Sequence, residues 1–294
     1  MREVLTEHGA GGAPEVTIVV PVFNAAATIA ECVSSLLALR YPRDRYEVVV
    51  VDNGSTDATP GILDGFRDGI RILGETTRGA SAARNRGIRN ASGRLIAFTD
   101  ADCAVEPDWL SVLLAPLRNL QVGVVGGRIL SRVNANRIER FGEFILDQRR
   151  AIEQEDLPYV ITANCASRRE VLHEVGLFDE TLLRGQDVDL AWRIHSLGYR
   201  LEYAPDAIVR HHNERTIWGL VHEGYVHGFH GRKVTGKHAA LRPHAVQNRT
   251  NIRSRLIGDL RRFARGGNRT DGLLWLLFDT GKTAGQLAAL AERR

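Results

Sequence analysis

The chain has 294 residues, 44% of them hydrophobic and 25% charged, a composition typical of a folded globular protein that excludes a fibrous or disordered one. Its net charge of +4 indicates an anionic partner without naming one. Three widely spaced cysteines form no CxxC pair, which argues against a zinc ribbon or a thioredoxin-like site and suits a reducing compartment.

Strands and helices alternate along the first two thirds of the chain. Continuous β-branched runs predict buried strands, and apolar residues at helical spacing predict the helices between them. The predicted strands are 16–23, 46–52, 70–73, 94–100 and 123–129, and the predicted helices are 26–39, 57–66, 79–91, 108–117 and 186–198. A short helix within 167–180 and two short strands within 200–212 follow the same criteria, whereas residues 131–160 match neither pattern. This order predicts an α/β doubly wound sheet, in which ligands bind beyond the carboxyl ends of the strands.

Acidic side chains follow two of these predicted strands. Asp52 ends one, and Asp100 and Asp102 follow another. Residues two apart on extended backbone project to the same side, so the carboxylates of Asp100 and Asp102 should lie close together. Two ionised carboxylates at that distance repel each other, and we therefore expect a positive partner for them. Carboxylate oxygens suit a hard cation such as Mg²⁺ or Mn²⁺. The alternative is a solvated loop with no ligand.

Two further positions could carry chemistry. Asp187 begins a predicted helix, where it could cap that helix or act as a general base. His211 and His212 end a predicted strand, and either imidazole could ligate a metal. Adjacent side chains point in different directions, so we expect at most one of the two to be a ligand.

Seven stretches in a fixed order give the chain a family resemblance. They are VVPVFN (19–24), VVVVDNGSTD (48–57), RGASAARNRGI (78–88), FTDADC (98–103), ANCASRREVLHEVGLFDE (163–180), GQDVDLAWRIHSLGY (185–199) and PDAIVRHH (205–212). With these stretches the chain resembles the family 2 inverting glycosyltransferases. The resemblance implies the GT-A fold, with a mostly parallel sheet and a Rossmann-like nucleotide-binding half.

The resemblance also implies roles for individual residues. It puts Pro21, Phe23, Asn24, Asp52, Gly79, Arg84, Asn85 and Asp100 at the nucleotide sugar, Asp102 and His211 at a divalent cation (Mg²⁺ or Mn²⁺), and Asn164, Cys165 and Gln186 beside the acceptor. Asp187 is implied to be the base. Many family members have an acid where this chain has Gln186, so we expect Asp187 alone to serve as base there.

The C-terminal part of the chain has a different composition. Seven of the ten histidines fall between His211 and His244, and residues 249–269 carry seven arginines against one acid. We therefore expect a catalytic domain over 16–235, after a flexible tail at 1–15, and a helical extension over 236–294. Residues 249–269 are predicted to form a basic amphipathic helix and residues 272–290 an apolar one. The extension could bind an anionic membrane surface or simply pack on the catalytic domain.

The expected function is metal-dependent, inverting transfer of a sugar from a nucleotide-diphosphate sugar to an acceptor hydroxyl. A cell-envelope glycan, a glycolipid or another lipid-linked molecule is the expected acceptor, and no motif indicates nucleic acid as a partner. A nucleotidyltransferase is disfavoured because 21–27 is not a basic, glycine-rich loop, and a non-catalytic binding module because Asp187 is present. No apolar leader and no apolar run near the ~20 residues of a spanning helix is found, so we expect a cytoplasmic protein, either free or peripheral on the inner membrane face.

Overall fold

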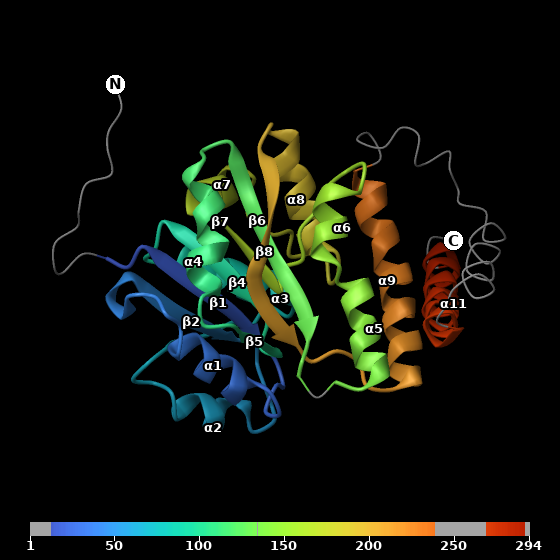
Figure 1. Ribbon diagram of the computed structural model, residues 1–294, viewed down its shortest axis with the longest axis horizontal. Helices are drawn as coiled ribbons and strands as arrows, with labels where there is room; N and C mark the ends of the chain where they lie inside the picture. The colour runs from blue at the N-terminus through green and yellow to red at the C-terminus, as the bar shows by residue number, and fades with distance from the viewer. Residues whose placement is uncertain (1–12, 134, 239–268, 292–294) are drawn as a thin grey trace.

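The computed structural model describes residues 13–133, 135–238 and 269–291. Most of the predicted N-terminal tail and nearly all of the basic helix predicted for 249–269 lie outside these residues. Within them, one mixed sheet of eight strands is flanked by helices on both faces, and two long helices lie beside it (Figure 1).

The strands, in chain order, are β1 (Val16–Val22), β2 (Tyr46–Asp52), β3 (Arg71–Gly74), β4 (Leu95–Thr99), β5 (Cys103–Val105), β6 (Val122–Ser131), β7 (Asn164–Arg168) and β8 (Arg200–His211). They are arranged in the order β3-β2-β1-β4-β7-β6-β8-β5. Parallel pairing joins β1 to β2 and β4, β2 to β3, and β6 to β8. The pairs β4–β7, β6–β7 and β5–β8 are antiparallel.

The α-helices are α1 (Ile29–Leu37), α2 (Thr59–Asp64), α3 (Ala80–Arg89), α4 (Trp109–Leu114), α5 (Arg137–Ile145), α6 (Gln148–Glu153), α7 (Arg169–Glu174), α8 (Gln186–Ser196), α9 (Ile217–Lys237) and α11 (Arg269–Ala291). Short 3₁₀ turns occupy Arg43–Arg45 and Ala115–Arg118. The five helices and five strands predicted between residues 16 and 198 are confirmed, with shifted ends.

The two faces of β1 explain why its sequence is apolar at almost every position. Val16, Ile18 and Val20 belong to the cluster that contains α1 and α4, whereas Val19 packs with residues of α3, α7 and α8. Successive side chains on a strand point to opposite faces, so a strand covered on both faces is apolar throughout. Thr17, also fully buried, donates its hydroxyl to Glu47. This central strand therefore fixes the layers on which the site is built.

The last strand differs from the prediction. Residues 200–212 were expected to hold two short strands, but β8 is one strand whose pairing with β6 skips from Ala204 to Ile208. Pro205 has no amide hydrogen to contribute to a ladder, so a skip in register there keeps the strand continuous. The prediction of two strands is wrong, and the irregularity at Pro205 is its cause.

Five helices and strands of the described residues were not predicted, among them the long helix α9, which no predicted helix covers. The strand β5 has only three residues, and β7 is a polar sequence that the family resemblance placed beside the acceptor. The helices α5 and α6 lie in 131–160, where neither periodicity is clear. Each helix begins at a residue whose side chain accepts a bond from the backbone: Asn136 from Glu139 N, and Asp147 from Arg150 N. These two N-caps were the missed sequence signal.

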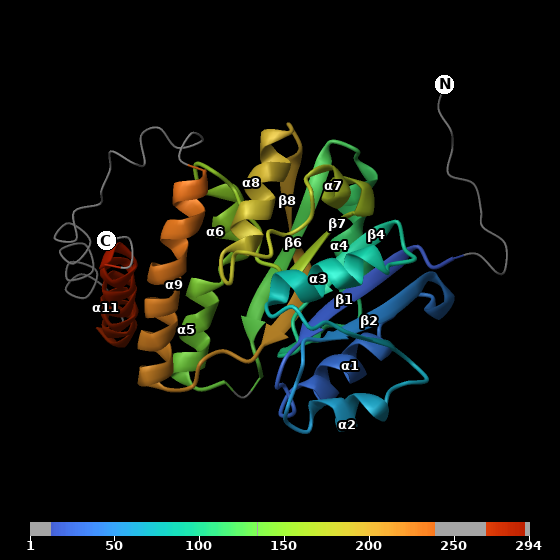
Figure 2. The same ribbon diagram turned by 180° about the vertical axis from the view of Figure 1, so that it is seen from behind.

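The helices α9 and α11 lie side by side at one edge of the molecule (Figures 1 and 2). A buried cluster joins both helices to α5 and so to the sheet domain. It consists of Leu220 of α9, Leu274 and Phe278 of α11, and Phe141 of α5. No helix in the described part of the chain is long and apolar enough to cross a membrane. The apolar helix predicted for 272–290 is confirmed. The predicted domain division, whose boundary falls inside α9, stays a prediction.

The crossing of α9 and α11 is built on glycine. Gly224 and Gly228 on α9 face Gly281 and Gly285 on α11, so each helix carries two glycines four residues apart. A Cβ added at any of these four positions would lie 1.9–2.2 Å from a carbonyl oxygen of the opposite helix. Helices approach this closely only where side chains are absent, as in the small-residue interfaces of membrane helices.

Candidate active site

A cavity of about 2580 Å³ lies beyond the carboxyl ends of the central strands. Its lining runs from the end of β1, past the loop after β4 and the start of α8, to α9 and α11. Of the predicted site residues, the lining contains Pro21, Phe23, Asn24, Arg84, Asp100, Asp102, Gln186, Asp187 and His211. It does not contain Asp52, Gly79, Asn85, Asn164 or Cys165. The structure therefore brings nine of the fourteen predicted positions to one surface.

The positive partner expected for the acidic pair is Arg84. Its Nη2 donates to Asp100 Oδ1 at 2.6 Å, and the guanidinium also lies over the ring of Phe178. Arg84 is only 3% exposed, yet its Nε and Nη1 have no hydrogen-bond partner among the described residues. An unpaired buried donor is costly, so the guanidinium of Arg84, which is among the lining residues, has hydrogen-bonding capacity that Asp100 alone does not satisfy.

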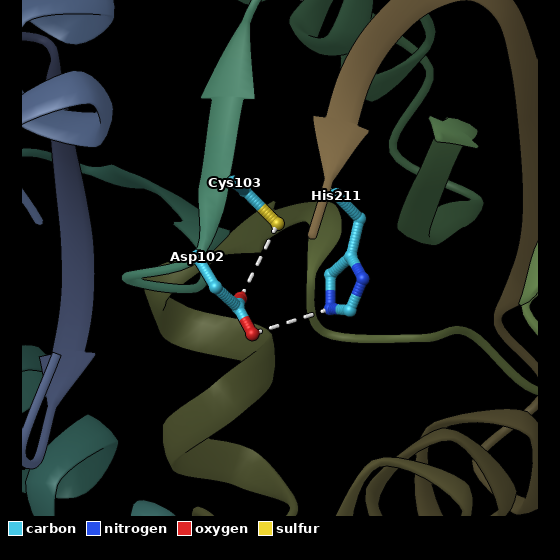
Figure 3. A group of neighbouring side chains, drawn as sticks. All are labelled: Asp102, Cys103 and His211. Carbon is cyan, nitrogen blue, oxygen red and sulfur yellow. Dashed lines mark hydrogen bonds and ion pairs between the residues drawn. The ribbon is translucent and has the colours of Figure 1, made fainter. Parts of the chain in front are cut away.

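Asp102 meets His211 because β5 pairs antiparallel with β8. Cys103 lies opposite His211 in that pairing, and the neighbouring Asp102 Oδ2 lies 3.5 Å from His211 Nε2 (Figure 3). Burial raises the pKa of Asp102, an effect that the nearby His211 opposes. Two ligands about 2.1 Å from one ion and at right angles to each other are about 3 Å apart, so the pair fits a hard divalent cation with little adjustment.

Asn213 sets the orientation of His211. Its Nδ2 donates to Ser131 Oγ (3.2 Å) and to Glu139 O (2.9 Å), so its Oδ1 is directed at His211 Nδ1, 2.7 Å away. An amide oxygen can only accept, so Nδ1 carries a proton, and in a neutral imidazole the lone pair is then on Nε2, the nitrogen nearer Asp102. Sequence reasoning missed this role, although an asparagine two residues after a candidate ligand was a usable signal.

Neither of the two remaining neighbours of Asp102 is placed as a further metal ligand. His212 Nε2 lies 3.1 Å from Glu31 Oε2, which separates the roles of the two adjacent histidines. Cys103 Sγ donates to Asp102 Oδ1 at 3.8 Å, and burial raises the pKa of its thiol well above the usual range. A thiol that stays protonated is a poor metal ligand. The oxygen and nitrogen pair, Asp102 and His211, is therefore the candidate donor set for a cation at this edge.

Asp187 lies in the first turn of α8 and faces the same cavity. Its Oδ1 accepts a hydrogen bond from Val188 N at 2.9 Å. Burial raises the pKa of Asp187, while this backbone bond and the charge of Arg84 hold the increase back. A carboxylate with a raised pKa is a better proton acceptor than an ordinary exposed one. Next to it, Gln186 is 8% exposed, and its Oε1 has no partner among the described groups.

A loop organised by Asn53 forms the other end of the cavity. Asn53 Nδ2 donates to the carbonyls of Glu75 and Thr77, and its Oδ1 accepts from Gly79 N at 2.7 Å. Gly79 has φ +121°, a conformation that glycine adopts readily, and this turn starts α3, the helix that carries Arg84. Gly79 thus shapes the site from behind the lining. Asn53 was not among the predicted site residues.

Phe23, Asn24 and Asp52 occupy the turns after β1 and β2. The Arg78 guanidinium lies over the Phe23 ring, whose side chain is 46% exposed. Asn24 Oδ1 accepts from Thr56 N at 2.8 Å, and Asp52 Oδ1 accepts from both the amide and the hydroxyl of Ser55. Asp52 therefore holds its own turn together, although it is half-buried and can still offer its second oxygen.

Three predicted site residues are fully occupied by the fold. Asn85 bonds both backbone groups of Phe178 through its amide, and Asn164 accepts from Trp109 Nε1 while donating to two carbonyls. Cys165 is buried in an apolar cluster, which raises the pKa of its thiol. The structure gives these side chains structural contacts and no exposure to the cavity. Their predicted binding roles are not supported by this geometry.

The sequence and the fold both match known glycosyltransferases. The family model described as glycosyl transferase family 2 matches residues 17–176. Glycosyltransferase AglE of Haloferax volcanii is 34% identical over 205 residues, 67% of this chain and 67% of that protein. Pre-mycofactocin glycosyltransferase of Mycobacterium tuberculosis is 36% identical over 208 residues, 67% of this chain but only 42% of that protein.

Solved structures extend the likeness beyond the family match. The mannosyltransferase PcManGT from Pyrobaculum calidifontis, in complex with GDP-Man and Mn²⁺, superimposes with a TM-score of 0.71 at 24% identity, covering 96% of this chain and 88% of that one. TarS of S. aureus in complex with UDP-GlcNAc gives a TM-score of 0.55 at 15% identity, covering 95% and 91%. Because the family model matches more than half of this chain, the chain belongs to glycosyltransferase family 2, and it has the GT-A fold.

Proposed function

We propose that this chain transfers a sugar from a nucleoside-diphosphate sugar to an acceptor hydroxyl, with inversion at the anomeric carbon. The observation that carries the proposal is that Asp187 and the Asp102–His211 pair line one cavity. A base and a site for the diphosphate's counterion are the two parts that such a transfer needs. The nucleotidyltransferase and non-catalytic alternatives have no comparable support, since the relatives at 34% and 36% identity are both glycosyltransferases.

On the donor side, Asp102 Oδ2 and His211 Nε2 would hold a divalent cation. When bound, that ion neutralises the charge that develops on the departing diphosphate. Arg84, with two unpartnered nitrogens, and Asp100 would bind the donor next to it. The related fold that holds GDP-Man with Mn²⁺ supports both the donor class and the need for a metal. Phe23, Asn24 and Asp52 would contact the nucleoside.

On the acceptor side, Asp187 would remove the proton of the attacking hydroxyl. The acceptor oxygen then forms a bond to the anomeric carbon, and the bond from that carbon to the β-phosphate oxygen breaks with its electron pair leaving on the diphosphate. Attack from the side opposite the leaving group inverts the configuration. Gln186 Oε1 would accept a hydrogen bond from the acceptor.

The acceptor and the membrane contact are proposed from the C-terminal side of the cavity and the charge of residues 249–269. The cavity lining extends to α9 and α11, where apolar side chains such as Leu287 and Leu290 line it beside charged ones. Trp218 is 83% exposed on α9, and residues 249–269 carry seven arginines. A lipid-linked acceptor at an anionic membrane surface matches this combination. Sedimentation with anionic and neutral liposomes tests it, and absence of binding to both at low salt would refute it.

The transfer is tested first through the donor. Sugar nucleotides are screened for protection against thermal unfolding with and without Mn²⁺, and the donor found is then followed for product release. Nucleoside diphosphate is the expected product, whereas pyrophosphate would indicate a nucleotidyltransferase. NMR of the glycoside formed should show the opposite anomeric configuration to the donor.

The base is tested by Asp187→Asn. Loss of a general base costs about 10²–10⁴-fold in rate, with donor affinity nearly unchanged. Asp68→Asn is the matched control, because Asp68 is exposed and does not line the cavity. An Asp187→Asn enzyme that turns over at the wild-type rate would remove Asp187 from the mechanism.

A further inference from the structure

The last two turns of α9 contact α8 on both sides of Asp187. Before it, Gly185 lies against Val234: a Cβ added to the glycine would be 2.8 Å from Val234 Cγ2. After it, Asp189 Oδ1 accepts from Lys237 Nζ at 2.7 Å and from His238 Nε2 at 2.8 Å. The residues two positions before and two positions after Asp187 are thus both held by the same short segment.

Asp189 is a fully buried carboxylate that depends on this segment. Its Oδ2 is bound by Arg193 of its own helix, at 2.9 Å from Nε and 2.7 Å from Nη2, whereas its Oδ1 is bound entirely from α9. Burial alone would raise the pKa of Asp189, but the bonds from Lys237, His238 and Arg193 hold it below the usual range. Removing the partners of a buried charge is strongly destabilising. The contact of Asp189 with Lys237 and His238 is therefore expected to be kept in the folded protein.

Neighbouring contacts make the attachment rigid. Lys237 Nζ also lies 2.6 Å from Asp179 Oδ2, in the loop before α8. The His238 ring packs edge-on against Trp192, with 5.3 Å between the centroids. Val234 is buried with Leu182 and Trp192. The end of α9 is therefore fixed to α8 and to the loop that leads into it.

The first turn of α8 has no side-chain cap among the described residues. It begins at Gly185, which has φ +73° and no side chain with which to cap the helix. The Asp187 carboxylate itself is hydrogen-bonded by the backbone of its own turn, at Val188 N. Its direction into the cavity therefore follows the position of that turn.

We propose that Lys237 and His238 are positioning residues for the base, and that the end of α9 holds the first turn of α8 in the reactive geometry. This rests on the proposed function, in which Asp187 is the base. It adds that transfer depends on the docking of the α9–α11 pair, because Lys237 is the last residue of α9 and His238 follows it directly. A misplacement of about 1 Å can cost 10²-fold in rate, so a loosened turn lowers kcat, whereas the residues proposed to hold the donor lie on other elements and keep its affinity.

The test compares Lys237→Met and His238→Leu with the conservative variants Lys237→Arg and His238→Gln. The first two should lower kcat about 10–100-fold, with KM for the donor within about twofold of wild type, and the conservative pair should recover most of the rate. Lys233→Met is the control, because Lys233 lies one turn earlier on α9, is exposed, and lies over the Phe229 ring of the same helix. That variant should keep the wild-type rate.

A double-mutant cycle separates positioning from general stability. In the Asp187→Asn background, adding Lys237→Met should leave the residual rate unchanged, because the base that Lys237 positions is already gone. Equal losses in both backgrounds, no loss of kcat in either single variant, or no recovery in the conservative pair would each overturn the inference. If Asp187→Asn alone retains full activity, it is the proposed base that fails. If Asp187→Asn is inactive and Lys237→Met is fully active, the assignment of Asp187 as base is kept. Only the positioning role of Lys237 is then refuted.

Discussion

Adding one methyl group at the helix crossing should destabilise the protein measurably. A Cβ at Gly228 would lie 1.9 Å from the carbonyl oxygen of Lys282 and 2.7 Å from its carbonyl carbon. Both atoms are backbone, so relief requires that α9 and α11 separate by about 1 Å. The three other glycine contacts lie on the same crossing and would loosen with it. Forcing extra carbon atoms into a packed interface costs about 1–3 kcal/mol.

The matched variant is Gly231→Ala, one turn further along α9. A Cβ there meets nothing within 4 Å. In both variants alanine favours the helix by about 1 kcal/mol over glycine, so that gain cancels when the two are compared. We expect Gly228→Ala to be less stable than Gly231→Ala by the overpacking cost, about 1–3 kcal/mol. Gly231→Ala should be slightly more stable than wild type.

Urea unfolding at constant pH, followed by tryptophan fluorescence, measures the difference. Trp275 packs on Phe141 and Phe278 beside the crossing and should report on its loosening. The midpoint of Gly228→Ala should lie below that of Gly231→Ala with a similar slope. Equal midpoints would show that the helices are not packed backbone to backbone, and the described crossing would be wrong.

Three more outcomes follow from the site. Asn213→Ala should weaken Mn²⁺ binding about 10–100-fold, measured by calorimetry with nucleoside diphosphate present, because the orientation of the His211 ring is lost; unchanged affinity would contradict this. Burial raises the pKa of Asp187 above its ordinary value of 3.8, and only the ionised form accepts a proton. The acidic limb of kcat/KM against pH should therefore have its midpoint above 3.8. A lower midpoint would exclude Asp187 as the base. Lys237 and Thr181 lower the pKa of Asp179 to about 2, so its stabilisation is complete above about pH 4 and lost as pH falls toward 2. Asp179→Asn should therefore lower the free energy of unfolding near neutral pH by about 2 kcal/mol before solvent screening, seen as a lower urea midpoint, and should have little effect near pH 2.

The nucleotide-binding half of the fold was predictable because local patterns decide it. The strand 16–22 is apolar at nearly every position since both of its faces are covered, and Asp100 and Asp102 follow a strand whose end is a ligand edge. Such information lies within a few residues. The same holds for Asp187, whose place at the start of α8 is set by the glycine before it and the apolar spacing after it.

Long-range pairing decided what the sequence could not. Three residues of β5 carry too little pattern to be recognised, yet their pairing with β8 is what puts Asp102 beside His211. Asn164 and Asn85 lie in stretches that carry the family resemblance. Only the structure shows that their side-chain amides are hydrogen-bonded to backbone groups. Lys237 and His238 both bind Asp189 Oδ1, although they are about fifty residues away in the sequence. The pattern within either helix gives no sign of this contact.

The edge pairing of β5 with β8 also affects how the protein is made. A chain still emerging from the ribosome exposes Asp102 long before His211 exists, so any ion held between them must wait until the final strand is in place. Contacts so distant in sequence form slowly during folding. Manganese that binds the pair would then favour the completed sheet over every shorter nascent form, and the metal's uptake would mark the end of synthesis of the catalytic sheet.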